Sequence, residues 1–284
     1  PAEAEALSLL GFQCRWLPAT PLRLDLHACA PAGAGRQAAV TSNAWVAAMI
    51  AQIRQTNLYL SLAELTGVQP VVAGGSYTNL RTRHQNSPAA LRRATDFAFE
   101  RFLALGLQPS FHPWSAAGIS NRNVVATLPG TTSSAQIVVV CAHLDDMPSG
   151  GLAPGADDNA SGSIAVLAAA EALRKYTFER TLRFVLFTGE EQGLYGSDAY
   201  AHAAQTAGEN LVAVLNLDMI AWDGNGDKVL NLYVRPGNAA ELDIAATFTN
   251  VARVYGLNDG VAPATVSETT DWSDHYSFHD YGFP

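Results

Sequence analysis

Hydrophobic residues recur along this chain with two spacings, one typical of helices and one typical of buried strands. Helical spacing marks four ranges: 44–67, 88–105, 163–176 and 244–255. The second range has the clearest limits, because Ser87 and Pro88 favour a helix start and Gly106 favours a helix end. Gly256 ends the last range in the same way. We therefore predict helices over these ranges.

Apolar runs alternate with the predicted helices and indicate strands. The runs cover residues 123–128, 136–141, 181–187 and 211–217. In the last three, almost every residue is apolar, which suits strands buried on both faces. Strands that alternate with helices are typical of α/β proteins. We predict an α/β fold, a mixed and mainly parallel β-sheet sandwiched between helices.

The composition favours one catalytic domain and argues against two classes of partner. A chain of 284 residues that is 48% hydrophobic and 15% charged has enough apolar material for one large core. The formal net charge is −9, and no cluster of Lys and Arg provides a surface for nucleic acid or an anionic membrane. No apolar run approaches the roughly 20 residues of a membrane span. The oligomeric state stays open.

Residues 1–42 differ from the rest of the chain because Ala, Pro and Gly dominate them. We interpret this range as a lead-in, either a linker or the remnant of a pro-segment, and residues 43–284 as the catalytic domain. Cys14 and Cys29 lie in the lead-in, and the sequence leaves open whether they pair. Cys141 lies in an apolar run, where a buried free thiol is expected.

Polar residues follow three successive predicted strands and suggest a metal site. They are His143 and Asp145, then Glu190 and Glu191, then Asp218, with an Asp157-Asp158-Asn159 turn after the first set. Ligands of open α/β sheets bind beyond the carboxyl ends of the strands. Carboxylates that converge there would repel each other unless a cation neutralised them. A mixture of His and carboxylates suits zinc, although manganese or cobalt could use the same ligands.

Each of these residues has a simpler explanation when taken singly. A histidine after a strand is usually structural, an Asp-Asp-Asn run is usually a turn, and adjacent glutamates are usually solvated. Their joint occurrence at successive strand ends favours the metal site. Neighbouring side chains such as Glu190 and Glu191 point in different directions, so one can bind metal while the other moves protons.

The segments around these residues resemble the co-catalytic zinc aminopeptidases, a family that includes bacterial leucyl aminopeptidases and their glutaminyl cyclase relatives. The resemblance runs from about Ala44 to the end and rests on HLD at 143–145, GADDNASG at 155–162, GEEQGLYGS at 189–197 and NLDM at 216–219. It implies a zinc exopeptidase-like, phosphorylase/hydrolase-like fold. It also implies an enzyme that removes the first residue, large and apolar such as Leu, from peptides with a free N-terminus.

The resemblance implies two Zn²⁺ ions per chain and a set of protein ligands. His143 and Asp218 would each bind one zinc on opposite sides, Asp157 would bridge both ions, and Glu191 would complete the shell of one. A cis peptide bond is expected between Asp157 and Asp158. The family has a fifth ligand, a second histidine, which we expect beyond the last residue of a chain that is cut short; His275 or His279 are alternatives.

The same resemblance implies roles beyond metal binding. Glu190 would be the general base, and Asp145 would orient His143 through its second ring nitrogen. Met219, beside Asp218, is a candidate for contacting the substrate, although it could equally be a core residue. A secreted or periplasmic protein is expected.

Other functions on the same fold stay open at this point. One is a glutaminyl cyclase or a carboxypeptidase-like hydrolase; another is a receptor or peptide-binding module without catalysis. Glutaminyl cyclases generally use one zinc, so a metal content near two would argue against that alternative. Non-enzymatic relatives have lost zinc ligands, whereas most of the expected ligands are present here.

Overall fold

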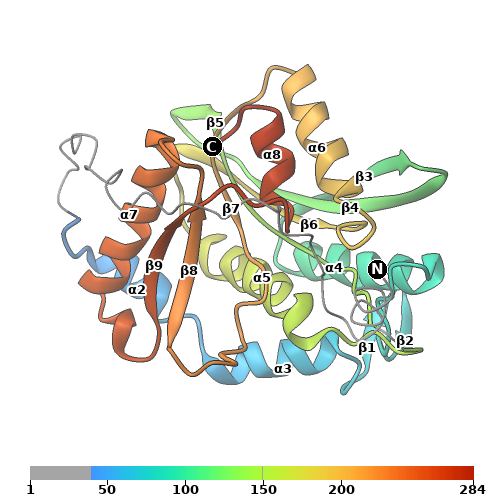
Figure 1. Cartoon of the computed structure of the whole chain (residues 1–284). Coiled ribbons are helices and arrows are strands. Elements are labelled where there is room, and N and C mark those ends of the chain that lie inside the picture. Colours follow the sequence, from blue (N-terminus) through green and yellow to red (C-terminus); the bar gives the residue numbers. More distant parts are fainter. Residues whose placement is uncertain (1–39, 149) are drawn as a thin grey trace, which may run out of the picture.

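The computed structural model describes residues 40–148 and 150–284 and has a five-stranded sheet at its centre (Figure 1). In sheet order the strands are β3 (Gln108–Ala116), β4 (Ile119–Leu128), β6 (Arg180–Phe187), β5 (Ser133–His143) and β7 (Asn210–Asn216). β4 is antiparallel to β3 and β6, whereas β5 is parallel to β6 and β7. The predicted α/β class with a mixed sheet is confirmed, and the parallel strands form the half of the sheet that carries the site.

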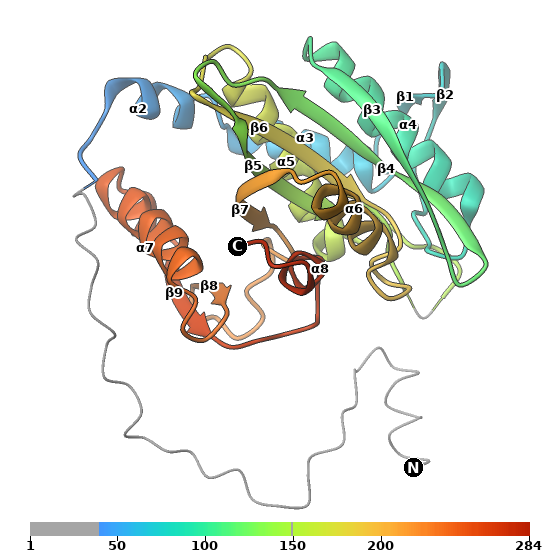
Figure 2. The same ribbon diagram turned by 90° about the horizontal axis from the view of Figure 1, so that it is seen from above.

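Helices cover both faces of this sheet (Figures 1 and 2). One face carries α3 (Gln55–Leu65), α4 (Pro88–Ala104) and α5 (Gly162–Leu173); the other carries α6 (Tyr195–Thr206) and α8 (His275–Asp280). Successive residues of a strand point to opposite faces. Phe184 and Leu186 of β6 therefore join the core under the first set of helices, while Val185 and Phe187 join the core under the second. This confirms that β6 is buried on both faces.

The remaining elements lie around the central sheet. They are α2 (Ala44–Ile50), the hairpin β1 (Val71–Ala73) and β2 (Ser76–Thr78), η1 (Ala156–Ser161), β8 (Val229–Val234), α7 (Ala239–Val254), η2 (Leu257–Asp259) and β9 (Ala262–Ser267). β8 and β9 form a separate parallel pair. In Figure 2 this pair and α7 lie to one side of the central sheet.

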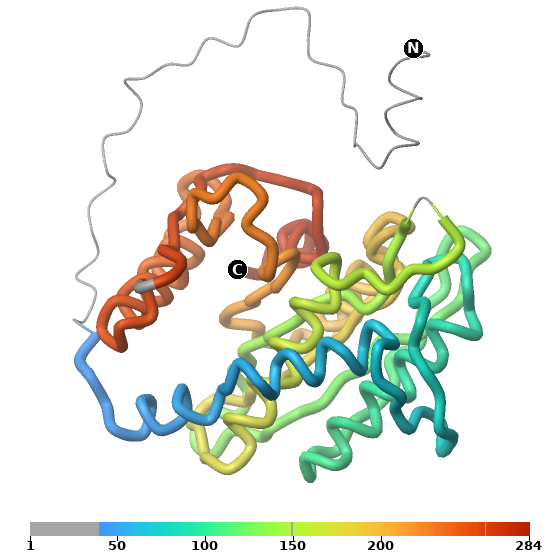
Figure 3. Tube along the Cα trace, turned by 90° about the horizontal axis from the view of Figure 1, so that it is seen from below, coloured from blue at the N-terminus to red at the C-terminus, as the bar shows by residue number. Residues whose placement is uncertain are grey.

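Most predicted elements are found, with one clear error. The four predicted strands correspond to β4, β5, β6 and β7, and three predicted helices correspond to α4, α5 and α7. A single helix over 44–67 is wrong, because an extended Arg54 (φ −118°, ψ 131°) starts α3 as a new helix after α2. Both helices contact α5 as they run past it (Figure 3), which explains why the apolar spacing continues across the break.

Several predictions concern the ends of the chain and its cysteines. The lead-in falls almost wholly outside the described residues, as do Cys14 and Cys29, so the domain boundaries and that pairing stay predictions. Cys141 is buried and free, as predicted. Within residues 40–148 and 150–284, no helix has the length and apolar character needed to cross a membrane.

Candidate metal and catalytic site

The carboxyl ends of β5, β6 and β7 bring polar side chains together at one edge of the sheet. Two groups have ligand atoms that all lie within 4.8 Å of one another: His143 with Asp158 and Glu191, and His143 with Glu190 and Asp218. His143 ends β5, the glutamates follow β6, and Asp218 follows β7. Since the three strands are parallel, their ends converge. The two groups overlap at His143.

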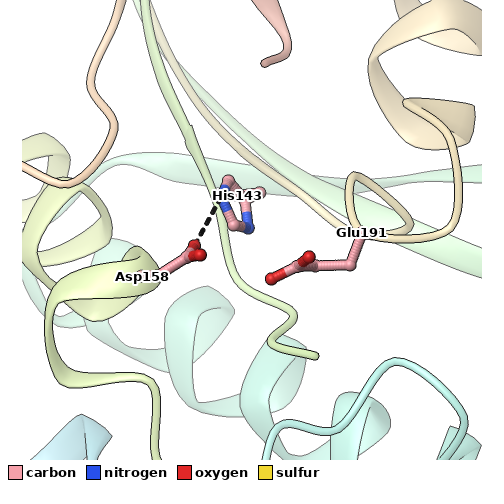
Figure 4. A group of neighbouring side chains, drawn as sticks. All are labelled: His143, Asp158 and Glu191. Carbon is pink, nitrogen blue, oxygen red and sulfur yellow. Dashed lines mark ion pairs between the residues drawn. The ribbon is translucent and has the colours of Figure 1, made fainter. Parts of the chain in front are cut away.

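His143 lies at the centre of the site and is only 1% exposed. Its Nε2 lies 3.3 Å from Oδ1 of Asp158 and 3.5 Å from Oδ1 of Asp218. Its Nδ1 lies 3.1 Å from the main-chain carbonyl oxygen of Asp145. Because a carbonyl only accepts, Nδ1 must donate, which leaves the lone pair of Nε2 for a metal in the neutral ring. Figure 4 shows Asp158 and Glu191 reaching toward this ring from two sides.

The ionisable groups of the site shift one another's pKa values. Burial raises the pKa of Glu190 to about 9, and the nearby Asp274 adds to the shift. Burial and Asp158 raise the pKa of Glu191 to about 8. Burial alone would lower the pKa of His143, but Asp158 and other carboxylates hold it well above its ordinary value. The raised pKa values of both glutamates show that the carboxyl groups at this edge of the sheet lack enough cationic partners to balance their ionised forms.

The donor set fits a bound divalent metal. Oδ1 of Asp218 is buried and has no hydrogen-bond partner among the described residues, while it faces Nε2 of His143. An orphaned buried carboxylate oxygen is costly unless a cation or donor meets it. One imidazole nitrogen with several carboxylate oxygens is a ligand set that zinc accepts. The residues present therefore fit the expected metal.

Asp218 is held in place from behind by a short chain of hydrogen bonds. Asn216 Nδ2 donates to Ser273 Oγ at 2.7 Å, and Ser273 Oγ donates to Asp218 Oδ2 at 2.5 Å. Burial would raise the pKa of Asp218, but His143 and Ser273 reverse the shift and lower it. This carboxylate is therefore ionised and fixed with its free oxygen toward the site.

The position of the turn aspartate differs from the prediction. Asp158 approaches His143, whereas Asp157 belongs to neither group and accepts a hydrogen bond from Ala221 N at 2.9 Å. Asp158 has extended backbone angles (φ −100°, ψ 100°) inside η1, and neighbouring side chains in extended backbone point in different directions. The cis peptide bond is Asp158–Asn159, not Asp157–Asp158 as expected. The cis bond was therefore predicted one residue too early, and the geometry of the described residues favours Asp158 over Asp157 as the candidate ligand.

The comparison with known families decides the class of protein. Residues 123–284, more than half of the chain, match the model of Peptidase family M28. The chain belongs to peptidase family M28. This confirms the aminopeptidase resemblance that the motifs indicated.

A curated relative agrees with membership of family M28, and two solved structures share the fold. A probable leucine aminopeptidase of Trichophyton verrucosum is 30% identical over 258 residues, which are 82% of this chain and 66% of that protein. Aminopeptidase LapA of Legionella pneumophila has a TM-score of 0.69 at 18% identity, over 88% of this chain and 65% of its own. A glutaminyl cyclase of Macrostomum lignano has a TM-score of 0.62 at 18% identity, over 87% of this chain and 81% of its own. At such identities the two structures show the fold alone.

The M28 chain spans only part of the curated relatives that it matches. The 258-residue match covers 66% of the Trichophyton verrucosum protein. A second match, to a probable leucine aminopeptidase of the same organism, is 39% identical over 120 residues, which are 39% of this chain and 32% of that protein.

Asp145 supports the M28 site in a different way from the one predicted. Its main-chain carbonyl orients His143, while its carboxylate lies 3.9 Å from Nδ1 of that ring. The carboxylate instead accepts hydrogen bonds from the main-chain N–H groups of Glu190 at 3.4 Å and Glu191 at 3.2 Å. Burial raises the pKa of Asp145, and these bonds act in the opposite direction. Asp145 therefore fixes the turn that carries both glutamates.

His143 and Asp218, which were expected to bind different zinc ions on opposite sides of the metal pair, lie in one candidate group with their ligand atoms 3.5 Å apart.

The two histidines that were alternatives for the fifth ligand contact other residues. His275 Nε2 lies 3.0 Å from Thr270 Oγ1, and His279 Nε2 lies 3.6 Å from Glu241. Neither histidine belongs to a candidate metal group of the described residues.

Met219 is 55% exposed and is therefore not the core residue that was its alternative interpretation. It directly follows Asp218 and has a positive φ of 48°. A strained backbone is typical of functional sites. Contact with substrate stays a prediction for this residue.

Two fully buried charged residues close to the site were not selected from the sequence. Asp274 directly precedes His275, and burial raises its pKa to about 7. Arg83 lies in a polar stretch that gives no sign of burial, yet its exposed fraction is 0%. For Asp274 the neighbouring candidate ligand His275 was a usable signal, whereas for Arg83 the sequence offers none.

Proposed function

We propose that this chain carries the catalytic domain of a zinc-dependent aminopeptidase that removes the first residue from peptides with a free N-terminus. The supporting observation is the pair of ligand groups that share His143 at the ends of three parallel strands of an M28 chain. The proposed ligands are His143, Asp158, Glu191 and Asp218, for two Zn²⁺ ions. A further histidine ligand beyond the last residue stays a prediction.

Glu190 is the proposed general base. Its side chain is 10% exposed, with Oε2 3.9 Å from Nε2 of His143, so it borders the proposed metal ligands. When bound, zinc supplies Lewis-acid chemistry that acidifies water and polarises a peptide carbonyl. From this position Oε2 of Glu190 could take the proton of the attacking water and deliver it to the leaving amine.

The proposed first residue of the substrate is large and apolar. Three apolar side chains that follow Asp218 are exposed to different degrees: Met219 by 55%, Ile220 by 38% and Trp222 by 77%. Exposed apolar surface beside a polar site suits an apolar ligand group. The relative named as a probable leucine aminopeptidase supports the same preference.

We also propose that the protein acts outside the cytoplasm, which cell fractionation tests.

The first test replaces the proposed base by its isosteric amide. Glu190→Gln in the zinc-loaded protein should lower kcat for leucyl-p-nitroanilide by about 10²- to 10⁴-fold, the usual contribution of a general base. Zinc content, measured by atomic absorption, should stay unchanged because Glu190 is not a proposed ligand. Glu179→Gln makes the same change at an exposed position just before β6 and should keep wild-type activity.

The outcome separates the proposed function from its alternatives. Cyclisation of a glutaminyl peptide without cleavage of leucyl-p-nitroanilide, together with one zinc per chain, would indicate a glutaminyl cyclase. Cleavage of peptides with a blocked N-terminus would indicate a different hydrolase. Wild-type rates in Glu190→Gln would contradict the assignment of the base.

A further inference from the structure

We infer that Arg83 is a positioning residue, which holds together the two main-chain segments that carry His143 and Asp158. The inference rests on the proposed metal site and adds to it a residue that touches neither metal nor substrate. Arg83 precedes α4 by a few residues and is distant in sequence from every proposed ligand. Its role follows from where its hydrogen bonds go.

Among residues 40–148 and 150–284, the guanidinium of Arg83 donates only to main-chain carbonyl oxygens. Nε donates to Leu144 at 2.7 Å, Nη1 to Pro154 at 2.5 Å and to Leu65 at 3.0 Å, and Nη2 to Gly155 at 2.9 Å. The side chain is fully buried, so water does not replace these bonds. One planar group therefore ties the end of α3 to two separate loops of the site.

Those two loops carry metal ligands. Leu144 directly follows His143, and Gly155 precedes Asp158 by one short turn within the same loop. His143 Nε2 and Asp158 Oδ1 are 3.3 Å apart, so a small shift of either loop would change the spacing of both ligands. Fixing the two carbonyls on one rigid fork fixes that spacing.

The main chain of Arg83 makes a second connection between the same loops. Its N–H donates to the carbonyl of Ala153 at 2.8 Å, and its carbonyl accepts from the N–H of Asp146 at 3.1 Å. Position 155 has no room for a side chain, since a Cβ there would lie 2.8 Å from Nη2 of Arg83 and 2.1 Å from the carbonyl oxygen of Asp158. The side chain and main chain thus brace the two loops independently.

The charge of Arg83 is retained in this buried position. Burial lowers its pKa to about 10, and Asp146, Asp145 and Asp158 act against that shift. The side chain is therefore protonated at neutral pH and offers a fixed positive charge to the acidic site. A lysine would keep the charge but lacks the planar fork of donors.

The test compares Arg83→Gln and Arg83→Lys with wild type in the whole protein. Zinc affinity, measured by competition with a chromogenic chelator, should fall by about 10- to 100-fold, the range known for groups that orient metal ligands. In zinc-saturated enzyme, kcat for leucyl-p-nitroanilide should fall while KM changes little. Arg83→Lys should restore part of the affinity because it keeps the charge and some donors.

Arg122→Gln is the matched control. Arg122 is largely but not fully buried, with Nη2 2.5 Å from Asp96 and Nε donating to Thr95 at 3.0 Å. Among the described residues, the hydrogen bonds and the ring contact of its side chain involve no proposed ligand. This variant should lose thermal stability but keep wild-type zinc affinity. It separates the general effect of replacing a buried arginine from the loss of the hydrogen bonds that hold the two loops together.

The outcomes are distinguishable. A folded Arg83→Gln with wild-type zinc affinity and kcat would overturn the inference. If Arg83→Gln does not fold, Arg83→Lys and Gly155→Ala carry the test, and unchanged zinc affinity in both would overturn it. A wild type that binds zinc without hydrolysing any peptide contradicts the proposed function alone, because the affinity comparison still applies. A wild type that binds no zinc contradicts both.

Discussion

Asp157 and Asp158 are adjacent, yet their carboxylates contact different parts of the site. Asp158 lies 3.3 Å from His143, whereas Asp157 accepts a hydrogen bond from Ala221 in the loop after β7. Ser161 adds a second contact to this loop, because its Oγ accepts from Ile220 N at 3.1 Å. Asp157 therefore holds the loop that follows Asp218, while Asp158 is placed to bind metal.

This difference predicts opposite effects of two neighbouring substitutions. Asp158→Ala should weaken zinc affinity by more than about 100-fold, beyond the usual effect of a supporting group. Asp157→Ala should keep the zinc content, measured by atomic absorption, and raise KM because the loop beside the proposed substrate site loosens. Asp157→Asn keeps an acceptor oxygen and should stay closer to wild type. If Asp157→Ala loses zinc and Asp158→Ala does not, Asp157 and not Asp158 is the metal ligand.

At the scale of elements, β6 and α4 place the core that supports the site. Phe102 of α4 is fully buried, and its ring centroid lies 6.5 Å from that of Phe184 in β6. β6 in turn leads directly into Glu190 and Glu191. Packing of this helix against the sheet therefore positions the proposed base and ligand through the strand.

Truncating this contact should destabilise the whole protein. Phe102→Ala should lower the free energy of unfolding by about 3–5 kcal/mol, the usual cost of removing a buried aromatic ring. Leu103→Ala is a suitable control, because the neighbouring side chain is 56% exposed, and it should cost less than about 1 kcal/mol. Urea unfolding followed by circular dichroism measures both. Equal effects would mean that burial does not decide the stability at this helix.

The elements that were not predicted share weak or mixed patterns. β3 contains Pro109 and Pro113 and lies at the edge of the sheet, where proline is tolerated but the strand pattern is lost. β8 and β9 are half exposed and pair only with each other in the described part of the chain. The strands buried in the middle of the sheet gave the strong signal, because both of their faces need apolar residues.

For the molecule as a whole, the acidic site should make stability depend on pH and on metal. Folding raises the pKa of Glu190 to about 9, of Glu191 to about 8 and of Asp274 to about 7. The folded state therefore binds more protons than the unfolded state between these values and the ordinary carboxyl pKa of about 4. Stability from these groups is complete below that ordinary pKa and is lost as pH rises through the folded values.

Metal-free protein should consequently become less stable as pH rises from about 5 to about 9, and zinc should remove most of this dependence. Bound metal favours the ionised carboxylates and competes with their protons. Urea midpoints measured across this range, with chelator and with zinc, check the prediction. Glu190→Gln should flatten the curve of the metal-free protein. Rising stability of the metal-free protein over the same range would contradict the proposed ionisation.

The sequence by itself determined four of the five strands of the central sheet and the residues at their carboxyl ends. A strand in the middle of the sheet needs a mainly apolar run, so the ionisable residues that follow it stand out, as His143, Glu190 and Asp218 do. Tertiary structure alone decided that Asp158 and not Asp157 faces His143, and that Arg83 is buried beneath the two loops. Side-chain direction in a tight turn and burial of a charge depend on contacts between distant segments, which no local pattern records.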